Sequence, residues 1–156
     1  MIRDQETINQ LLDLIERFVR ERLIPAEEQM AEEGKLPDAL LQEMRELGLF
    51  GLTIPEEYGG AGGDFGHEAV ILIEAARANL ASWGHGIHSG IVAHYILAYG
   101  TEEQKKRWLP RMVTGELVGA LAMTEPSGGS DVQGIKTRAI RDGNAYRLSG
   151  QRRSSP

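Results

Sequence analysis

The sequence predicts a mainly α-helical fold: an N-terminal helical bundle over residues 1–115, followed by the first strands of an incomplete β domain over residues 116–150. Apolar residues recur at steps of three and four along most of the first 115 positions, which is typical of amphipathic helices. Beyond Gly115 the pattern changes to short apolar or alternating runs of strand length. Because a helical block followed by strands forms two different kinds of layer, two domains are expected.

The first predicted helix begins at Thr7, since Thr7 and Gln10 have the spacing of a capping box. Pro25 is expected to kink or break this helix, because proline has no N–H to donate and its ring clashes with the preceding turn. The acidic stretch over residues 26–33 is expected to continue as a solvated turn or two of helix. The apolar positions that form one buried stripe are Ile8, Leu11, Leu12, Ile15, Phe18, Val19 and Leu23.

Four more helices are predicted. The second begins at Pro37 and Asp38 and ends at Gly48, a residue suited to a left-handed helix end. A loop rich in glycine follows over residues 54–64, and the third and fourth helices cover about residues 66–80 and 83–99. The fifth helix begins at a second capping box, formed by Thr101 and Gln104, and ends at Gly115. Pro110 lies inside this last pattern.

Three strands are expected in the second domain, over residues 117–123, 136–141 and 145–148. The dipeptide Asp142-Gly143 predicts a hairpin between the last two. Three strands are near the minimum for an independently stable sheet, so the sheet is expected to be incomplete.

Composition and charge exclude several classes of function. The chain has 156 residues and no cysteine, which excludes disulfides and thiolate metal sites. Its net charge of −6 argues against nucleic-acid binding, although residues 131–156 hold six basic and two acidic groups. No apolar run is long enough for a membrane span, and no signal core is evident, so the expected location is the cytoplasm. His85, His88 and His94 suggest a metal site, but zinc needs three or four converging ligands, so no metal is expected.

The strongest candidate for chemistry is the segment over residues 124–131, Thr-Glu-Pro-Ser-Gly-Gly-Ser-Asp, which follows a predicted strand. A glycine-rich turn at a strand end exposes backbone N–H groups that can hold a phosphate or a ring carbonyl, and the hydroxyl groups add directed hydrogen bonds. Composition alone favours an ordinary surface loop over a binding loop. It is neither a Walker loop nor a dinucleotide-binding glycine motif.

Residues 122–131 (Ala-Met-Thr-Glu-Pro through Gly-Ser-Asp) resemble the signature of the acyl-CoA dehydrogenases. Other motifs occur in the same order as in that family, and the similarity extends from about residue 5 to residue 150. Residues 88–92 and 130–134 resemble most the long-chain type. The further matching motifs are Ile-Pro-Glu-Glu-Tyr-Gly-Gly at 54–60, Gly-Thr-Glu-Glu-Gln-Lys at 100–105, Trp-Leu-Pro at 108–110 and Gly-Ile-Lys-Thr at 134–137.

The resemblance implies an FAD-dependent oxidoreductase of fatty-acid β-oxidation, which oxidises the Cα–Cβ bond of an acyl-CoA thioester. It implies that Met123 and Thr124 bond the isoalloxazine edge, and that Ser130 lies near the pyrophosphate and the CoA moiety. It also implies an electron-transfer flavoprotein or similar acceptor as partner, and a homotetramer. The implied cofactor-binding residues are Leu121, Ala122, Met123, Thr124, Gly129 and Ser130.

Several parts of the family are not found in this sequence, which leads to the expectation of a truncated chain. The catalytic glutamate is expected beyond residue 156, so no catalytic residue is assigned, and the chain by itself is expected to be inactive and to retain no FAD. Residues 151–156 are interpreted as an aberrant tail, which loss of a single base from a family-like reading frame would produce. Two alternatives stay open. One is a fragment of an acyl-CoA oxidase or flavin monooxygenase of the same superfamily, and the other is a helical interaction module or a nonfunctional truncated product.

Overall fold

The computed structural model describes residues 5–80, 83–126 and 130–151. Its chain divides into two compact units, Met1–Ala120 and Leu121–Pro156, which are described separately below. The first unit is helical and the second contains a two-stranded sheet, so the structure is mainly α-helical as predicted.

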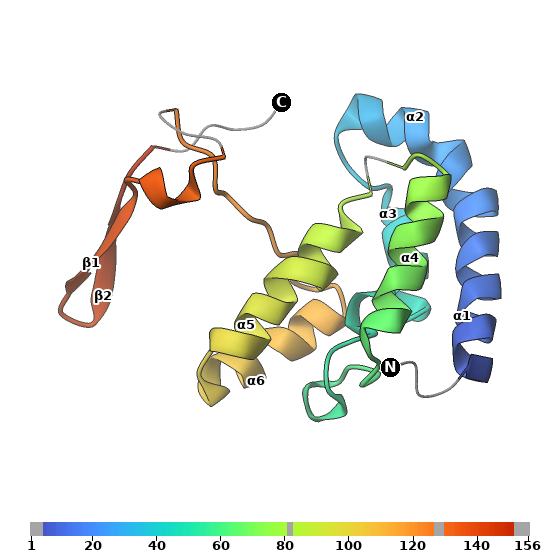
Figure 1. The fold of residues 1–156 in the computed structure, drawn as a ribbon, viewed down its shortest axis with the longest axis horizontal. Helices are drawn as coiled ribbons and strands as arrows, with labels where there is room; N and C mark the ends of the chain where they lie inside the picture. Colours follow the sequence, from blue (N-terminus) through green and yellow to red (C-terminus); the bar gives the residue numbers. More distant parts are fainter. Residues whose placement is uncertain (1–4, 81–82, 127–129, 152–156) are drawn as a thin grey trace. The chain divides into compact units, whose positions relative to one another are not determined.

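The first helical run consists of α1 (Gln5–Phe18), a π-helical segment η1 (Val19–Leu23) and α2 (Ile24–Glu33). Of the expected kink or break at Pro25, the break is wrong, because helical backbone angles continue through Leu23 and Ile24, whereas α2 does run in a different direction from α1 (Figure 1). The reason is local: the Ile24 N–H donates to the Val19 carbonyl, and this wider turn precedes the proline, which stands in the first turn of α2. The predicted start at Thr7 is also wrong, because α1 already includes Gln5.

The second predicted helix is confirmed as α3 (Asp38–Glu46), and Gly48 behind it has the expected left-handed φ of 67°. The short turns η2 (Leu49–Gly51) and η3 (Glu56–Tyr58) follow. The glycine-rich loop folds back on this region, since the Gly63 N–H donates to the Leu52 carbonyl over 2.8 Å. A Cβ on Gly63 would come within 2.6 Å of that carbonyl oxygen, so only glycine fits here.

Helix α4 (Phe65–Arg77) confirms the third predicted helix and packs beside α1 (Figure 1). The Asp64 side chain caps it by accepting a hydrogen bond from the Gly66 N–H over 2.9 Å. This helix carries two buried carboxylates, Glu68 and Glu74, which is unusual for a helix in a small domain.

The fourth predicted helix is divided into a π-helical segment η4 (Gly86–Val92) and α5 (Ala93–Tyr99). Helix α6 (Glu102–Val113) then packs against α5 (Figure 1). Its predicted capping box is confirmed: the Gln104 N–H donates to Thr101 Oγ1, and the Thr101 N–H donates to Gln104 Oε1. The helix continues through Pro110 to its end.

Two apolar clusters form the core of the helical unit. The larger joins α1, η1, α2, α3 and α4, and includes fully buried Ile15, Leu23 and Ile71. The smaller joins the loop before η3, α5 and α6, and its buried members are Ile54, Tyr58, Ala93, Leu109 and Met112. Most of the stripe predicted for the first helix is confirmed, since Ile8, Ile15, Phe18, Val19 and Leu23 are all buried.

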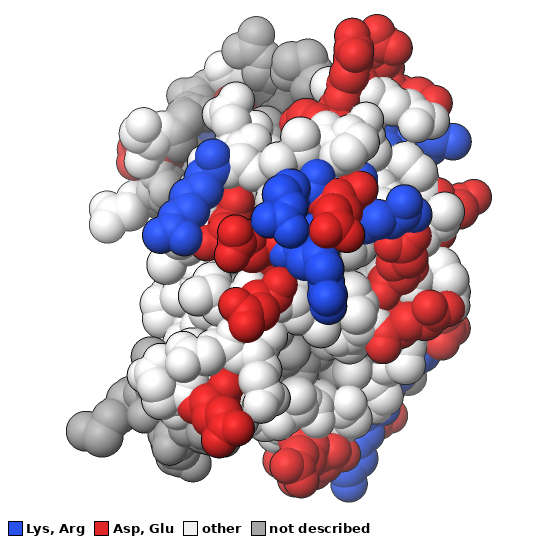
Figure 2. Space-filling model, turned by 90° about the vertical axis from the view of Figure 1, so that its right-hand side faces the viewer, with Lys and Arg blue, Asp and Glu red and all other residues white. Residues whose placement is uncertain are grey.

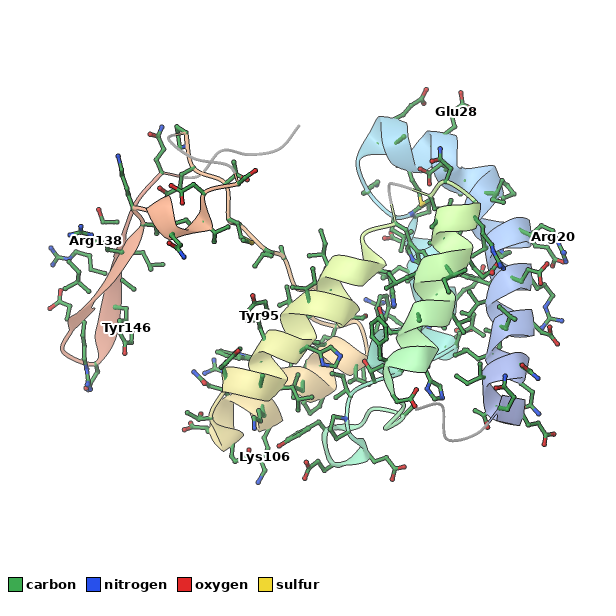
Figure 3. The ribbon with its side chains drawn as sticks, in the orientation of Figure 1. Arg20, Glu28, Tyr95, Lys106, Arg138 and Tyr146 are labelled. Carbon is green, nitrogen blue, oxygen red and sulfur yellow. The ribbon has the colours of Figure 1, made fainter. Side chains whose placement is uncertain are left out.

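The second unit contains the antiparallel strands β1 (Arg138–Asp142) and β2 (Ala145–Ser149), joined by the two-residue loop over residues 143–144. The predicted hairpin is therefore confirmed, and the φ of 62° at Gly143 suits a tight turn. All residues of both strands are exposed, and Figure 3 shows Arg138 and Tyr146 projecting from them. The strand expected over residues 117–123 is wrong: no strand is assigned there, because none of the described residues forms a ladder with it.

The surface of the helical unit carries both signs of charge. Figure 2 shows acidic and basic groups interspersed over the face on the right of Figure 1. Ion pairs of the helical unit include Arg20 with Glu16 and Arg22 with Glu43. Among the helices described, none is both long and apolar enough to cross a membrane.

Candidate functional site

The segment predicted to hold a cofactor lies at the start of the second unit. Leu121, Ala122, Met123, Thr124 and Ser130 are all exposed, whereas Gly129 lies outside the described residues. Residues 121–124 belong to no helix or strand, so their backbone N–H and C=O groups are not used in a sheet ladder. The hydroxyl groups of the exposed residues Thr124 and Ser130 can supply hydrogen bonds to a polar ligand.

Two carboxylates fix the backbone around this segment. Glu125 is 6% exposed and accepts hydrogen bonds from the Lys136 and Thr137 N–H groups, each over 2.8 Å. The Asp131 side chain accepts from the Gly134 N–H over 3.1 Å and caps the short turn η5 (Val132–Gly134). Both acidic residues of the motif therefore hold the loop backbone in place by accepting hydrogen bonds from backbone N–H groups.

A second candidate site, which the sequence did not indicate, is a cavity of about 460 Å³ in the helical unit. One wall belongs to α4 and the residues before it, and contains Gly63, Phe65, Glu68 and Leu72. The volume lies within the range of roughly 300–1,000 Å³ that is typical of small-molecule sites.

The opposite wall is the π-helical segment η4 and the start of α5, represented by Gly86, Gly90, Ile91 and His94. The two glycines let η4 approach α4 closely, because a Cβ on Gly86 would lie 3.2 Å from the Leu72 side chain and one on Gly90 would lie 3.3 Å from Glu68 Oε1. π-helical turns are rare and occur frequently at functional sites. One wall of the cavity is therefore formed by a π-helical segment, a conformation that often occurs at functional sites.

Two polar pairs adjoin this cavity. Thr53 Oγ1 lies 2.9 Å from His94 Nε2, so these two side chains satisfy each other. Glu68 Oε1 lies 3.4 Å from His85 Nε2, and both of these side chains are almost completely buried. Apart from these groups, the lining is dominated by apolar side chains and glycine backbone, as a site for a hydrocarbon chain would be.

His88, next to this region, is occupied by backbone contacts. The Gly119 N–H donates to its Nδ1 over 2.9 Å, and its Nε2 lies 3.2 Å from the Met112 carbonyl oxygen. Since Nδ1 accepts, the proton of the neutral ring resides on Nε2 and is donated to that carbonyl. Burial lowers the pKa of His88 below its usual value, which agrees with a neutral ring.

The three histidines considered for a metal site have different surroundings. His88 is bonded to backbone, His94 to Thr53, and His85 lies beside Glu68. In the described part of the chain, no group of three or more His, Cys, Asp or Glu side chains could hold a metal ion. The sequence analysis did not single out Glu68, Gly86 or Gly90. The signal available in the sequence was Glu68, a charged residue on an otherwise apolar helix face.

Comparison with known proteins finds a family model that covers most of the helical unit. The model described as "Acyl-CoA dehydrogenase, N-terminal domain" matches residues 5–116. The long-chain specific acyl-CoA dehydrogenase of Sus scrofa mitochondria is 39% identical over 138 residues, which cover 88% of this chain and 32% of that protein. The chain thus spans about a third of the length of this curated relative.

Solved structures give the same result for the fold. The acyl-CoA dehydrogenase of Geobacillus kaustophilus matches with a TM-score of 0.87 and 37% identity, over 97% of this chain and 40% of that one. The acyl-CoA dehydrogenase of Bacillus anthracis, solved in complex with FAD, matches with a TM-score of 0.84 and 36% identity, over 96% of this chain and 26% of that one.

Proposed function

This chain belongs to the acyl-CoA dehydrogenase family, and from that premise we propose that it supplies the N-terminal helical domain and the start of the β domain of an FAD-dependent acyl-CoA dehydrogenase. The enzyme would remove a proton from Cα and a hydride from Cβ of an acyl-CoA thioester, leaving a double bond between them. FAD, when bound, supplies the acceptor for the hydride.

The residues of the second unit fit the cofactor that the family implies. Thr124 and Ser130 are exposed residues whose hydroxyl groups can donate to a flavin edge and to a pyrophosphate or CoA phosphate, and exposed Met123 lies next to Thr124 in the segment that the resemblance assigns to the flavin. Glu125 supports this assignment, because it holds the neighbouring backbone through two hydrogen bonds and lets the segment keep one shape.

The observation that carries the proposal from this chain's own geometry is the cavity between α4 and η4. Its walls are mainly apolar, its volume suits a hydrocarbon chain, and its glycines let η4 approach α4 closely. We assign it to the acyl group of the substrate. Burying a methylene group contributes about 0.8 kcal/mol, so such a cavity would favour longer acyl chains up to the length that fills it.

The apolar surface of this unit supports assembly with further protein. Phe65 is 74% exposed, Tyr99 is 82% exposed, and Tyr95 on α5 is exposed as well (Figure 3). Large aromatic side chains that remain in solvent are typical of surfaces that another domain or subunit covers. In the assembled enzyme, a homotetramer by the family's pattern, these faces would be covered, and an electron-transfer flavoprotein or a similar acceptor would reoxidise the flavin.

The proposal is tested with a chimera in which residues 5–120 of this chain replace the matching segment of the Geobacillus kaustophilus acyl-CoA dehydrogenase. We expect a yellow protein that reduces an artificial electron acceptor when an acyl-CoA is added. Leu72→Trp, which fills the cavity, should shift the preference toward shorter acyl chains. Ile73→Trp, on the same helix but outside the lining, should leave the preference unchanged.

Two results of this test would count against the proposal. A folded chimera that holds flavin but oxidises no acyl-CoA would remove the acyl-CoA assignment. Hydrogen peroxide formed in place of acceptor reduction, in contrast to the parent enzyme, would favour the acyl-CoA oxidase or monooxygenase reading.

A further inference from the structure

Glu68 is a carboxylate in the wall of the acyl cavity. It lies on α4, is 3% exposed, and lines the cavity. Within the described residues, neither of its side-chain oxygens has a hydrogen-bond partner. A buried polar group without a partner destabilises the fold, and more so when it is charged, so this carboxylate lowers stability unless something binds to it.

His85 lies next to this carboxylate. Its Nε2 is 3.4 Å from Glu68 Oε1, and both of its ring nitrogens lack a hydrogen-bond partner among the residues described. The ring stacks on Trp83 with 5.0 Å between ring centroids and lies 6.2 Å from the ring of Phe50. Aromatic packing therefore holds the imidazole in place beside the Glu68 carboxylate.

The neighbouring polar groups cannot satisfy this pair, because they are already engaged. His88 uses both ring nitrogens on backbone groups, and His94 is paired with Thr53. Gly90, across the cavity wall, presents no side chain, and a Cβ there would lie 3.3 Å from Glu68 Oε1. Glu68 and Gly90 thus both line the cavity, and His85, which is not itself a lining residue, lies directly beside the Glu68 carboxylate.

We propose that Glu68 and His85 form a polar subsite that binds a hydroxyl group on the acyl chain, so that the substrate class is hydroxylated acyl-CoA thioesters. This inference rests on the proposed function, since it takes the cavity to be the acyl site. A hydroxyl group both donates and accepts: it donates to the carboxylate, and it accepts from the imidazole when Nε2 carries a proton. A carboxylate on the ligand would be repelled by Glu68, and an ammonium group would leave the imidazole unpaired.

The test uses the full 156-residue chain and measures binding by titration calorimetry. The probes are dodecanoyl-CoA and a series of monohydroxydodecanoyl-CoA thioesters whose hydroxyl group stands at successive carbons. We expect at least one hydroxylated thioester to bind about tenfold more tightly than dodecanoyl-CoA, as a hydrogen bond to a charged group predicts. The preference should depend on the hydroxyl position, because the subsite occupies one place in the cavity.

Two variants form a matched pair. Glu68→Met should abolish the preference for the hydroxylated ligand and leave the affinity for dodecanoyl-CoA equal or higher. Glu74→Met changes another buried carboxylate of α4, one that pairs with Arg77 and is not part of the cavity wall, so the preference should persist. Should Glu68→Met fail to fold, Glu68→Gln keeps the side-chain shape, and its weaker neutral hydrogen bond should reduce the preference.

The possible failures are distinguishable. If neither ligand binds the wild-type chain, the assignment of the cavity to the acyl group is wrong and the proposed function loses its geometric support. If dodecanoyl-CoA and all hydroxylated thioesters bind equally, the cavity is an acyl site without a polar subsite. If the preference survives in Glu68→Met, another residue causes it.

Discussion

At the scale of single residues, buried polar groups in this chain divide into those with backbone partners and those without. Glu125 and His88 each bind two backbone groups, and both therefore hold segments that are distant in sequence. Glu68 and His85 are equally buried but have no hydrogen-bond partner within the described residues. Buried groups with backbone partners fix the local conformation of the chain, whereas buried groups without a hydrogen-bond partner indicate a binding site for a ligand.

His88 predicts a dependence of stability on pH. Burial lowers its pKa in the folded state, so the unfolded chain binds the proton more readily. The stability from neutral His88 is complete above the unfolded pKa of about 6.5 and is lost as the pH falls from there toward the lower folded pKa. Urea unfolding at pH 7.5 and pH 5.5 should show this loss. His88→Gln should be less stable at pH 7.5, with a smaller difference between the two pH values; an unchanged difference would contradict the assignment.

Glu125 predicts a local effect in the second unit. Glu125→Gln replaces one of two accepting oxygens by an NH₂ group that faces a backbone N–H, and should weaken this contact by about 1–3 kcal/mol. Hydrogen exchange at the Lys136 and Thr137 amides should therefore become faster. Asp142→Asn, which alters only an exposed ion pair with Arg147, is the control and should leave these two amides unaffected.

At the scale of elements, the start of α6 is defined by its own sequence. Thr101→Ala removes the side-chain acceptor of the capping box and should lower the free energy of unfolding by about 1 kcal/mol, as measured by chemical denaturation. Thr114→Ala, at the other end of the helix, removes only a hydrogen bond from an exposed hydroxyl group to the Arg111 carbonyl. Its effect should be clearly smaller, and equal losses would show that the cap is not the cause.

Other elements depend on what surrounds them. The chain around Pro25 stays helical for two reasons. The π-helical turn η1 replaces the α-helical turn before the proline, and Val19, Leu23 and Met30 are buried in the same core. The run over residues 117–123 has the apolar content of a strand but forms none, since a strand needs a partner along its whole edge.

At the scale of the whole molecule, the two units differ in how much they bury. The helical unit has two apolar clusters, whereas every residue of β1 and β2 is exposed. Amides of the hairpin should therefore exchange hydrogen much faster than amides of α3, α4 and α6, measured by hydrogen–deuterium exchange on the full chain. Similar protection in both units would contradict this prediction.

The sequence by itself determined the helical class, the ends of α3 and α6, the hairpin and the family resemblance. These features follow from local rules: period, capping side chains, glycine at left-handed positions, and a continuous motif. Contacts between distant parts of the chain decided instead that residues 117–123 pair with no strand, and that Glu68, in the wall of a cavity, meets both His85 and Gly90. The physical reason is that burial and pairing are set by contacts between residues far apart in the chain, which no local pattern records.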